Sequence, residues 1–125
     1  MKKLIYSWEE YNIDIKDIIK GLHTNKLKFS AIYGIPKGGL VLATTLANKL
    51  NIPLYLSLNS IPKSISKKNI LIVDDVSDSG LTLLRIPGIE KYSTLTLFYK
   101  PQTSFIPDYT CRKCDNKLWI VYPWE

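Results

Sequence analysis

The stretch "ILIVDDVSDSGLT", residues 70–82, limits what this chain can fold into more than any other part of it. It opens with four aliphatic residues in a row, which is typical of a strand buried on both faces of a sheet. Two adjacent carboxylates, Asp74 and Asp75, come at the end of this strand, and a third follows at Asp78. Such charges are costly to bury unless a cation or a hydrogen-bond donor meets them. Because folding gains nothing from the cluster, the stretch predicts a binding site.

Strands alternate with helices along the chain, which predicts a parallel α/β sheet. Ser7 and Glu10 have the spacing of a capping box at the start of the first helix, and Gly21 lies near its expected end. The length of 125 residues suits a single domain, 1–125. We expect strands over 29–33, 52–58, 70–73 and 93–100, helices over 7–22 and 40–50, and a short helix after Gly80. At the C-terminus, 108–111 and 118–122 are expected to pair as a small hairpin or flap.

Two turns at the carboxyl ends of strands carry polar chemistry, and ligands bind at that edge of a parallel sheet. The carboxylate pair Asp74 and Asp75 suits vicinal hydroxyls and a hydrated Mg²⁺. The turn "GIPKGG" at 34–39 combines a lysine with three glycines, which suits a phosphate. The turn after Asp75 offers backbone amides and hydroxyls to a second phosphate, through Ser77, Ser79, Gly80 and Thr82. A diol beside a phosphate, with a cation nearby, describes a sugar phosphate.

Composition narrows the remaining classes of function. The net charge is +6, but the lysines are dispersed and aromatic residues do not interleave with them, so nucleic-acid binding is the weaker interpretation. No apolar run could span a bilayer and no signal-peptide pattern is present, so we expect a cytoplasmic protein without a membrane partner. Cys111 and Cys114 have metal-ligand spacing, but zinc normally takes four ligands, so we interpret them as ordinary thiols. His23 is interpreted as a surface residue.

Three blocks of the sequence together resemble one family. "ILIVDDVSDSGLT" resembles the phosphoribosyl-pyrophosphate (PRPP) binding motif of type I phosphoribosyltransferases, and "GIPKGGL" resembles their pyrophosphate loop. The C-terminal "FYKP…DY…LWIVYPWE" looks like the hood of bacterial xanthine–guanine and archaeal-type hypoxanthine enzymes. The blocks occur in family order and cover most of the chain from about Phe29 onward. The resemblance implies a parallel α/β sheet with a small C-terminal hood over approximately 101–125.

The resemblance assigns roles to the carboxylates and to the turn beyond them. Asp74 and Asp75 would hold the ribose hydroxyls and act as ligands of Mg²⁺, directly or through water. Asp78 would lie near N7 of the purine and handle proton transfer, so that all three acids are candidate catalytic residues. The 5′-phosphate loop would comprise Ser77, Asp78, Ser79, Gly80, Leu81 and Thr82.

The remaining site residues come from the other two blocks. Lys100 would donate a hydrogen bond to the 6-oxo group of the base, Trp119 would stack on the purine, and the Ile120 backbone would recognise its 2-position. Simpler interpretations are a solvated strand-end lysine for Lys100 and a core-covering side chain for Trp119. Glu125 is a weaker candidate for an acid near the base. Pyrophosphate would be bound by Pro36, Lys37, Gly38 and Gly39, with the Pro36–Lys37 peptide bond in the cis form, as in relatives.

The sequence therefore predicts an enzyme of the glycosyltransferase class, a pentosyltransferase of purine salvage. Its substrates would be PRPP and guanine, xanthine or hypoxanthine, and its products pyrophosphate and GMP, XMP or IMP. The loop over 59–68 is shorter than the lid that such enzymes usually place there, so a PRPP- or nucleotide-binding regulatory protein with little turnover is the alternative. A nucleic-acid-binding regulator is a third interpretation, supported only by the net charge. The resemblance also implies a homo-oligomer, either a dimer or a tetramer.

Overall fold

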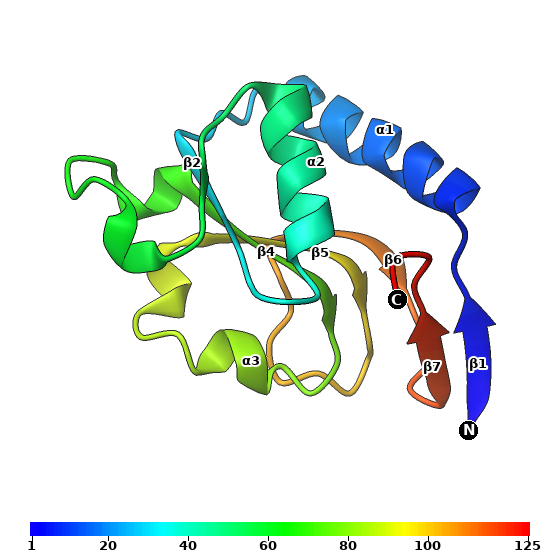
Figure 1. Ribbon diagram of the computed structural model, residues 1–125. Coiled ribbons are helices and arrows are strands. Elements are labelled where there is room, and N and C mark those ends of the chain that lie inside the picture. Colours follow the sequence, from blue (N-terminus) through cyan, green and yellow to red (C-terminus); the bar gives the residue numbers. More distant parts are fainter.

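A central parallel sheet with helices on both faces forms most of the computed structural model, which describes all 125 residues (Figure 1). Its five strands lie in the order β3-β2-β4-β5-β6, and a separate parallel pair joins β1 to β7. The parallel α/β architecture predicted from the sequence is thereby confirmed. The elements are β1 (Lys2–Ile5), α1 (Trp8–Thr24), β2 (Ala31–Gly34), α2 (Leu40–Leu50), β3 (Leu54–Tyr55), β4 (Ile70–Ser77), α3 (Leu81–Leu84), β5 (Ser93–Tyr99), β6 (Tyr109–Lys113) and β7 (Leu118–Val121).

Strand β4 lies at the centre of the sheet and is buried on both faces, as its aliphatic run predicts. Leu71 and Val73 belong to the larger apolar cluster, which includes residues of α1 and α2. Ile70 and Ile72 point to the other face and join a second cluster, which includes Leu83 of α3. Figure 1 shows the same division, with α1 and α2 on one side of the sheet and α3 on the other. The alternation follows from the two-residue period of a strand.

The same strand is longer than the sequence pattern indicates. The aliphatic run predicts an end at Val73, whereas β4 continues through both carboxylates to Ser77. The extension is paired on one side only, because Val76 and Ser77 lie opposite β5 while β2 ends opposite Val73. The carboxylates are therefore part of a strand with one unpaired side, and this opens them toward the turn that precedes α2.

The two long helices form where the sequence predicts them. Helix α1 begins after Ser7, whose hydroxyl accepts the Glu10 amide while the Glu10 carboxylate accepts the Ser7 amide, and it continues past Gly21. Asp14, buried on this helix, ties it to β6 because Arg112 donates to both carboxylate oxygens, at 2.9 and 3.1 Å. Helix α2 has the predicted bounds. None of the helices has the length and apolar character that crossing a membrane requires.

The edges of the fold differ from the predictions. The predicted strand over 52–58 is reduced to β3, because Pro53 has no amide hydrogen for the ladder and Ser57 caps a short 3₁₀ turn. The predicted C-terminal hairpin is wrong, because β6 pairs in parallel with β5 and β7 pairs in parallel with β1. Strand β1 has no local signal in the sequence. Lys3 lies opposite Trp119 and Ile5 lies opposite Val121, so the N-terminus supports the C-terminal segment.

Two glycines provide a matched test of this packing. A Cβ at Gly39 would lie 2.3 Å from the Val73 carbonyl oxygen, whereas a Cβ at Gly21 would meet nothing within 4 Å. Gly39→Ala is expected to lower the free energy of unfolding by about 2 kcal/mol or more, because backbone atoms of β4 must move. Gly21→Ala is expected to raise it by about 0.5–1 kcal/mol, because Ala is the better helix former. Urea unfolding measures both, and equal stabilities would contradict this account of the turn.

Candidate active site

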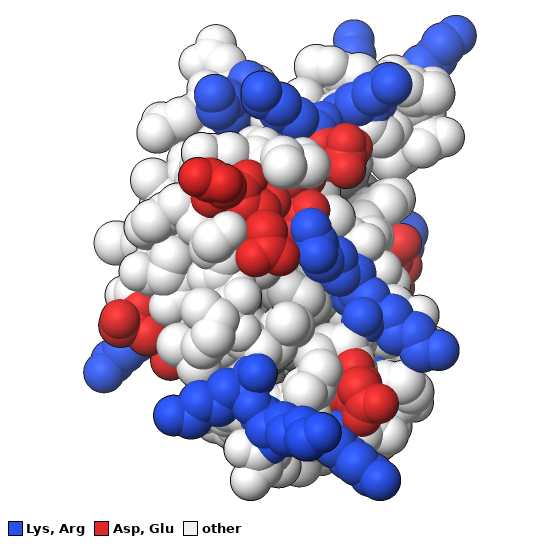
Figure 2. Space-filling view, turned by 90° about the vertical axis from the view of Figure 1, so that its right-hand side faces the viewer, with Lys and Arg blue, Asp and Glu red and all other residues white.

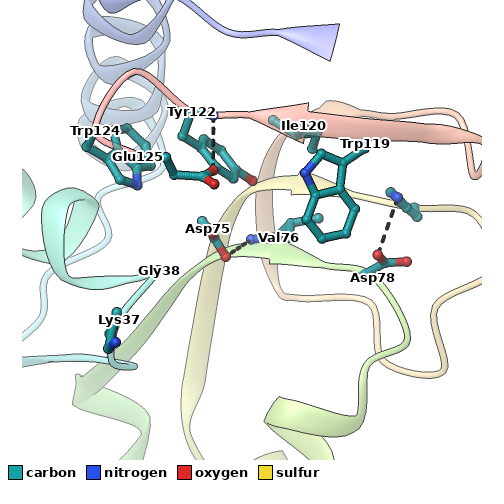
Figure 3. A pocket seen from close by; sticks show the side chains of 11 residues that line it. Lys37, Gly38, Asp75, Val76, Asp78, Trp119, Ile120, Tyr122, Trp124 and Glu125 are labelled. Carbon is teal, nitrogen blue, oxygen red and sulfur yellow. Dashed lines mark hydrogen bonds and ion pairs between the residues drawn. The ribbon is translucent and has the colours of Figure 1, made fainter. Parts of the chain in front are cut away.

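A cavity of about 450 Å³ lies at the carboxyl end of the sheet and gathers residues from segments far apart in the sequence (Figure 3). The turn before α2, the end of β4, the residue after β5 and the C-terminal segment each contribute to it. Seven predicted site residues line this cavity: Lys37, Gly38, Asp75, Asp78, Lys100, Trp119 and Ile120. Glu125, the weaker candidate, lines it as well. The sheet topology therefore brings the predicted base and pyrophosphate residues together.

Asp74 and Asp75 are adjacent on β4, and their side chains hydrogen-bond to each other. Asp75 lines the large cavity and approaches Gly38 so closely that a Cβ on this glycine would lie 2.5 Å from its Oδ2. Asp74 lines only the smaller cavity, which has a volume of about 180 Å³ and is formed by the turn between β4 and α3. The carboxylate pair therefore joins two neighbouring cavities.

The electrostatics of the pair are unfavourable in the ligand-free protein. Burial, followed by the charge of Asp75, raises the pKa of Asp74 to about 8. Burial also raises the pKa of Asp75. The ion pairs of the chain involve Lys100 and Arg112, and neither of these cations pairs with Asp74 or Asp75. Two buried carboxylates without a cationic partner fit a divalent cation that takes further oxygen ligands from a substrate. The chain has no cluster of three or more His, Cys, Asp or Glu that could hold a metal by itself.

Asp78 and Lys100 form an ion pair at one side of the large cavity. Lys100 Nζ lies 3.3 Å from Asp78 Oδ2 and donates to the Leu118 carbonyl oxygen at 2.7 Å. Gln102 Nε2 holds the other Asp78 oxygen at 2.8 Å. Lys100 is only 3% exposed, so its interpretation as a solvated strand-end lysine is wrong. A buried ammonium beside a carboxylate, aimed at a cavity, presents a donor and an acceptor to the same ligand.

Trp119 and Ile120 form the β7 side of the cavity. Trp119 is 55% exposed, so it does not cover the core as its simpler interpretation holds. Figure 3 shows its ring beside Val76 and between Ile120 and Asp78. The neighbouring Ile120 is buried. An exposed aromatic face above an aliphatic side chain is an arrangement that suits a flat, apolar ring.

The smaller cavity is formed by the turn between β4 and α3. It is lined by both members of the carboxylate pair, by Val76 and Leu83, and by five residues of the predicted phosphate loop: Ser77, Asp78, Ser79, Gly80 and Thr82. Gly80 has φ +87°, and a Cβ there would lie 2.6 Å from the Phe105 amide nitrogen, so only glycine fits. The Ser77 hydroxyl donates to the Phe105 carbonyl oxygen at 2.6 Å. Because α3 is a single turn, backbone amides and the remaining hydroxyls must supply most of the attraction for an anion.

Three predicted site residues, Leu81, Pro36 and Gly39, lie outside both cavities. Leu81 begins α3, and its amide donates to Ser79 Oγ. Pro36 and Gly39 line neither cavity, although the Pro36–Lys37 bond is cis as predicted. Gly39 instead packs against the backbone of β4. These residues therefore contribute to the shape of the two turns without lining either cavity.

Comparison with known proteins identifies the family. No protein-family model matches the chain. Two curated relatives are xanthine-guanine phosphoribosyltransferases: that of Cereibacter sphaeroides is 27% identical over 95% of this chain and 84% of its own length, and that of Gluconobacter oxydans is 23% identical over 95% and 82%. The crystal structure of a purine phosphoribosyltransferase from Pyrococcus horikoshii is 31% identical, covers 100% of this chain and 95% of that one, and has a TM-score of 0.78. The chain belongs to the type I phosphoribosyltransferases.

Several residues that line or contact the two cavities were missed by sequence reasoning, among them Tyr122, Trp124 and Gln102. Tyr122 and Trp124 line the large cavity, and their rings stack with centroids 4.8 Å apart. Both belong to "YPWE", which ends in the candidate residue Glu125. Their closeness to Glu125 in the sequence was the signal that could have marked them as site residues. Gln102 has no such signal, because only the fold brings it to Asp78.

Neither the cysteines nor the histidine lines either cavity, although the charges of Lys100 and Asp78 act on the buried Cys114. Cys111 and Cys114 are both free. Burial, followed by the charge of Asp14, raises the pKa of the Cys111 thiol to about 12, so this thiol stays protonated. His23 is exposed in the last turn of α1.

The raised pKa of Asp74 predicts a pH dependence of stability. Between the unfolded value of 3.8 and the folded value of about 8, the folded protein keeps a proton that the unfolded chain has released. The stability contributed by this group is therefore present below pH 4 and is lost as the pH rises toward 8. Asp74→Asn is expected to be more stable than the wild type by at least about 1 kcal/mol at pH 8, with a smaller difference at pH 5.

Denaturant unfolding of the ligand-free protein in EDTA, at pH 5 and pH 8, measures this difference. The exposed Asp17→Asn serves as the control and should track the wild type at both values. Wild-type and Asp74→Asn stabilities that run parallel with pH would contradict the account of the carboxylate pair.

Proposed function

We propose that this chain transfers the phosphoribosyl group of PRPP to a 6-oxopurine, giving a nucleoside 5′-monophosphate and pyrophosphate in purine salvage. The observation that carries the proposal is the large cavity. It brings together a buried lysine, an exposed tryptophan, a glycine–lysine turn and Asp75 of the carboxylate pair. The curated relatives carry the name of this activity.

The proposed reaction assigns one task to each side of the two cavities. A purine nitrogen attacks C1 of the ribose, the bond from C1 to the pyrophosphate oxygen breaks, and positive charge develops on the sugar. Lys37 and the Gly38 amide would receive the leaving pyrophosphate, while Asp74 and Asp75 would hold the ribose hydroxyls and stabilise the cationic ring. Asp78 would accept the proton that the base loses. The turn with Ser79, Gly80, Leu81 and Thr82 would hold the 5′-phosphate.

Lys100 supports a 6-oxopurine rather than adenine. An ammonium has three N–H donors, of which one is used by Leu118 and a second faces Asp78. The third would donate to a 6-oxo group, whereas the 6-amino group of adenine offers no acceptor there. Trp119 would stack on the base, and the Ile120 backbone would contact its 2-position.

The carboxylate pair fits the cation that the resemblance implies. Asp74 and Asp75 are two adjacent oxygen donors whose buried charges lack a cationic partner. Mg²⁺ bound together with the diphosphate of PRPP would offset the charge that the leaving group acquires. The pair alone is too small a ligand set for a permanent metal site, which agrees with a cation that arrives with its substrate.

A regulatory PRPP- or nucleotide-binding protein is the second candidate, and one observation favours it. The loop over 59–68, where relatives usually have a mobile lid, is short and partly anchored. Ile61 is 5% exposed and packs in the second apolar cluster with Ile70 and Ile89. A loop held in this way covers the reacting sugar poorly, which would permit ligand binding with little turnover.

Charge, cysteine state and surface composition bear on the partners of the chain. On the face shown in Figure 2, Lys and Arg gather in separate groups with carboxylates between them, which disfavours a continuous nucleic-acid groove.

We propose a cytoplasmic location, in agreement with two free cysteines. We propose a homo-oligomer, a dimer or tetramer, because large apolar side chains such as Leu56 and Ile106 are exposed. We also propose that β1 and β7 together form the hood over a single domain.

The first test is a conversion assay with PRPP and guanine, xanthine, hypoxanthine or adenine, with and without Mg²⁺. Turnover of a 6-oxopurine that disappears without Mg²⁺, with adenine inert, is the expected result. Binding of PRPP without turnover of any base would favour the regulatory candidate. Absence of both binding and turnover would contradict both candidates.

The carboxylate pair can be tested by neutralisation. Asp74→Asn combined with Asp75→Asn is expected to reduce PRPP-dependent activity by at least about 10³-fold with the fold intact, because both acceptors of the ribose hydroxyls lose their charge. Glu9→Gln combined with Asp17→Asn makes the same charge change at exposed positions and should leave activity unchanged. Circular dichroism checks the fold, and unchanged kinetics in the first variant would refute the site.

A further inference from the structure

The hydroxyl of Tyr122 is the only buried side-chain nitrogen or oxygen atom in the chain without a hydrogen-bond partner. Tyr122 follows β7 directly and is 5% exposed. Its ring stacks on Trp124 and meets Tyr6 and Phe98 edge-on, with centroids about 6.1 Å away in each case. Buried polar groups are nearly always satisfied, so an unpaired hydroxyl in a well-packed aromatic cluster requires an explanation.

The other buried tyrosines show that the missing bond is particular to this position. Tyr6 donates to Asp14, and Tyr11 donates to Thr45 Oγ1 at 2.7 Å. Tyr11 is also part of the same aromatic cluster, with its ring centroid 5.4 Å from that of Trp124. A phenylalanine at position 122 would fill the same space without an unpaired hydroxyl. Packing alone therefore does not account for the tyrosine.

Two carboxylates line the same cavity as Tyr122, and their charges act on its hydroxyl. Tyr122 lines the large cavity with Asp75 and Glu125, and in Figure 3 its ring extends from the C-terminal segment toward β4. Asp75 Oδ1 accepts the Val76 amide at 2.8 Å, and Glu125 Oε1 accepts the Tyr122 amide at 3.1 Å. The other hydrogen bonds of Asp75 are with the neighbouring Asp74 carboxyl and with its own amide, and the Glu125 carboxylate has no further one. Burial, followed by the charge of Asp75, raises the pKa of Tyr122, so the hydroxyl keeps its proton and can donate.

We propose that Tyr122 is a positioning residue whose hydroxyl donates to Asp75 when a ribose occupies the site. A diol donates to the carboxylate pair, so Asp75 must turn one oxygen toward the sugar, and the Tyr122 hydroxyl holds the other. The C-terminal segment, which carries Trp119 against the base, thereby also orients the carboxylate that holds the ribose. The inference rests on the proposed function, because it needs a ribose phosphate as the ligand.

The test compares Tyr122→Phe with Tyr11→Phe and uses two nucleotides as probes. Calorimetric titration with GMP is expected to show binding about tenfold weaker in Tyr122→Phe than in the wild type, and unchanged in Tyr11→Phe. 2′-Deoxy-GMP lacks one hydroxyl of the diol. For this nucleotide, the dissociation constant of Tyr122→Phe should exceed that of the wild type by less than about threefold. The thermal midpoint of ligand-free Tyr122→Phe should equal or exceed that of the wild type, whereas Tyr11→Phe should lose about 2–5 °C, because only it loses a hydrogen bond.

Each outcome separates this inference from the proposed function. Wild-type binding of GMP together with unchanged binding in Tyr122→Phe overturns the role of Tyr122 and leaves the proposed function standing. An equal loss for GMP and 2′-deoxy-GMP also overturns it, because the effect would not pass through the diol. A thermal midpoint of Tyr122→Phe well below the wild type assigns the hydroxyl a structural role instead. Wild-type protein that binds neither PRPP nor GMP overturns both.

Discussion

The burial of two adjacent carboxylates on the central strand is the interaction on which the rest of the site depends. Asp74 and Asp75 lie on an extension of β4 that has a strand neighbour on one side only. Burial raises the pKa of both groups, and no lysine or arginine pairs with either. The ligand-free protein therefore disfavours charge on this pair, and a cation and a diol would relieve that cost. This trade of stability against binding is typical of functional sites.

Close backbone packing places the neighbouring turn against these carboxylates. Gly38 approaches the Asp75 carboxylate, and Gly39 rests on the backbone of β4, at distances that exclude any Cβ. The glycines of "GIPKGG" therefore serve the fold and the proposed site together. The packing brings Lys37, a cation, to the rim of the cavity that Asp75 lines.

The two termini jointly build the other wall of the cavity. Strand β7 carries Trp119 and Ile120, and its only strand partner is β1. The Asp14–Arg112 ion pair ties the helix after β1 to β6, and Tyr6 adds a hydrogen bond to the same carboxylate. The first fourteen residues, which contribute no side chain to either cavity, therefore support the wall against which a base would lie.

The sequence by itself determined the local structure and the chemical types at the site. The aliphatic run of β4, the capping box of α1 and the bounds of α2 follow from periodicity and capping, which act over a few residues. The acids were recognisable because a cluster of carboxylates has no role in folding at the end of a buried strand, and Lys37 because it lies in a glycine-rich turn that suits a phosphate. Lys100 and Trp119 were assigned only through the resemblance, since a lysine or tryptophan has ordinary explanations in any strand.

Only the tertiary structure decided what depends on contacts between distant segments. The pairing of β1 with β7, the place of β6 in the main sheet and the length of β4 are set by strand neighbours, which no local pattern encodes. Gln102 reaches Asp78 for the same reason. The unpaired hydroxyl of Tyr122 could be found only there, because whether a buried donor is satisfied depends on every atom around it.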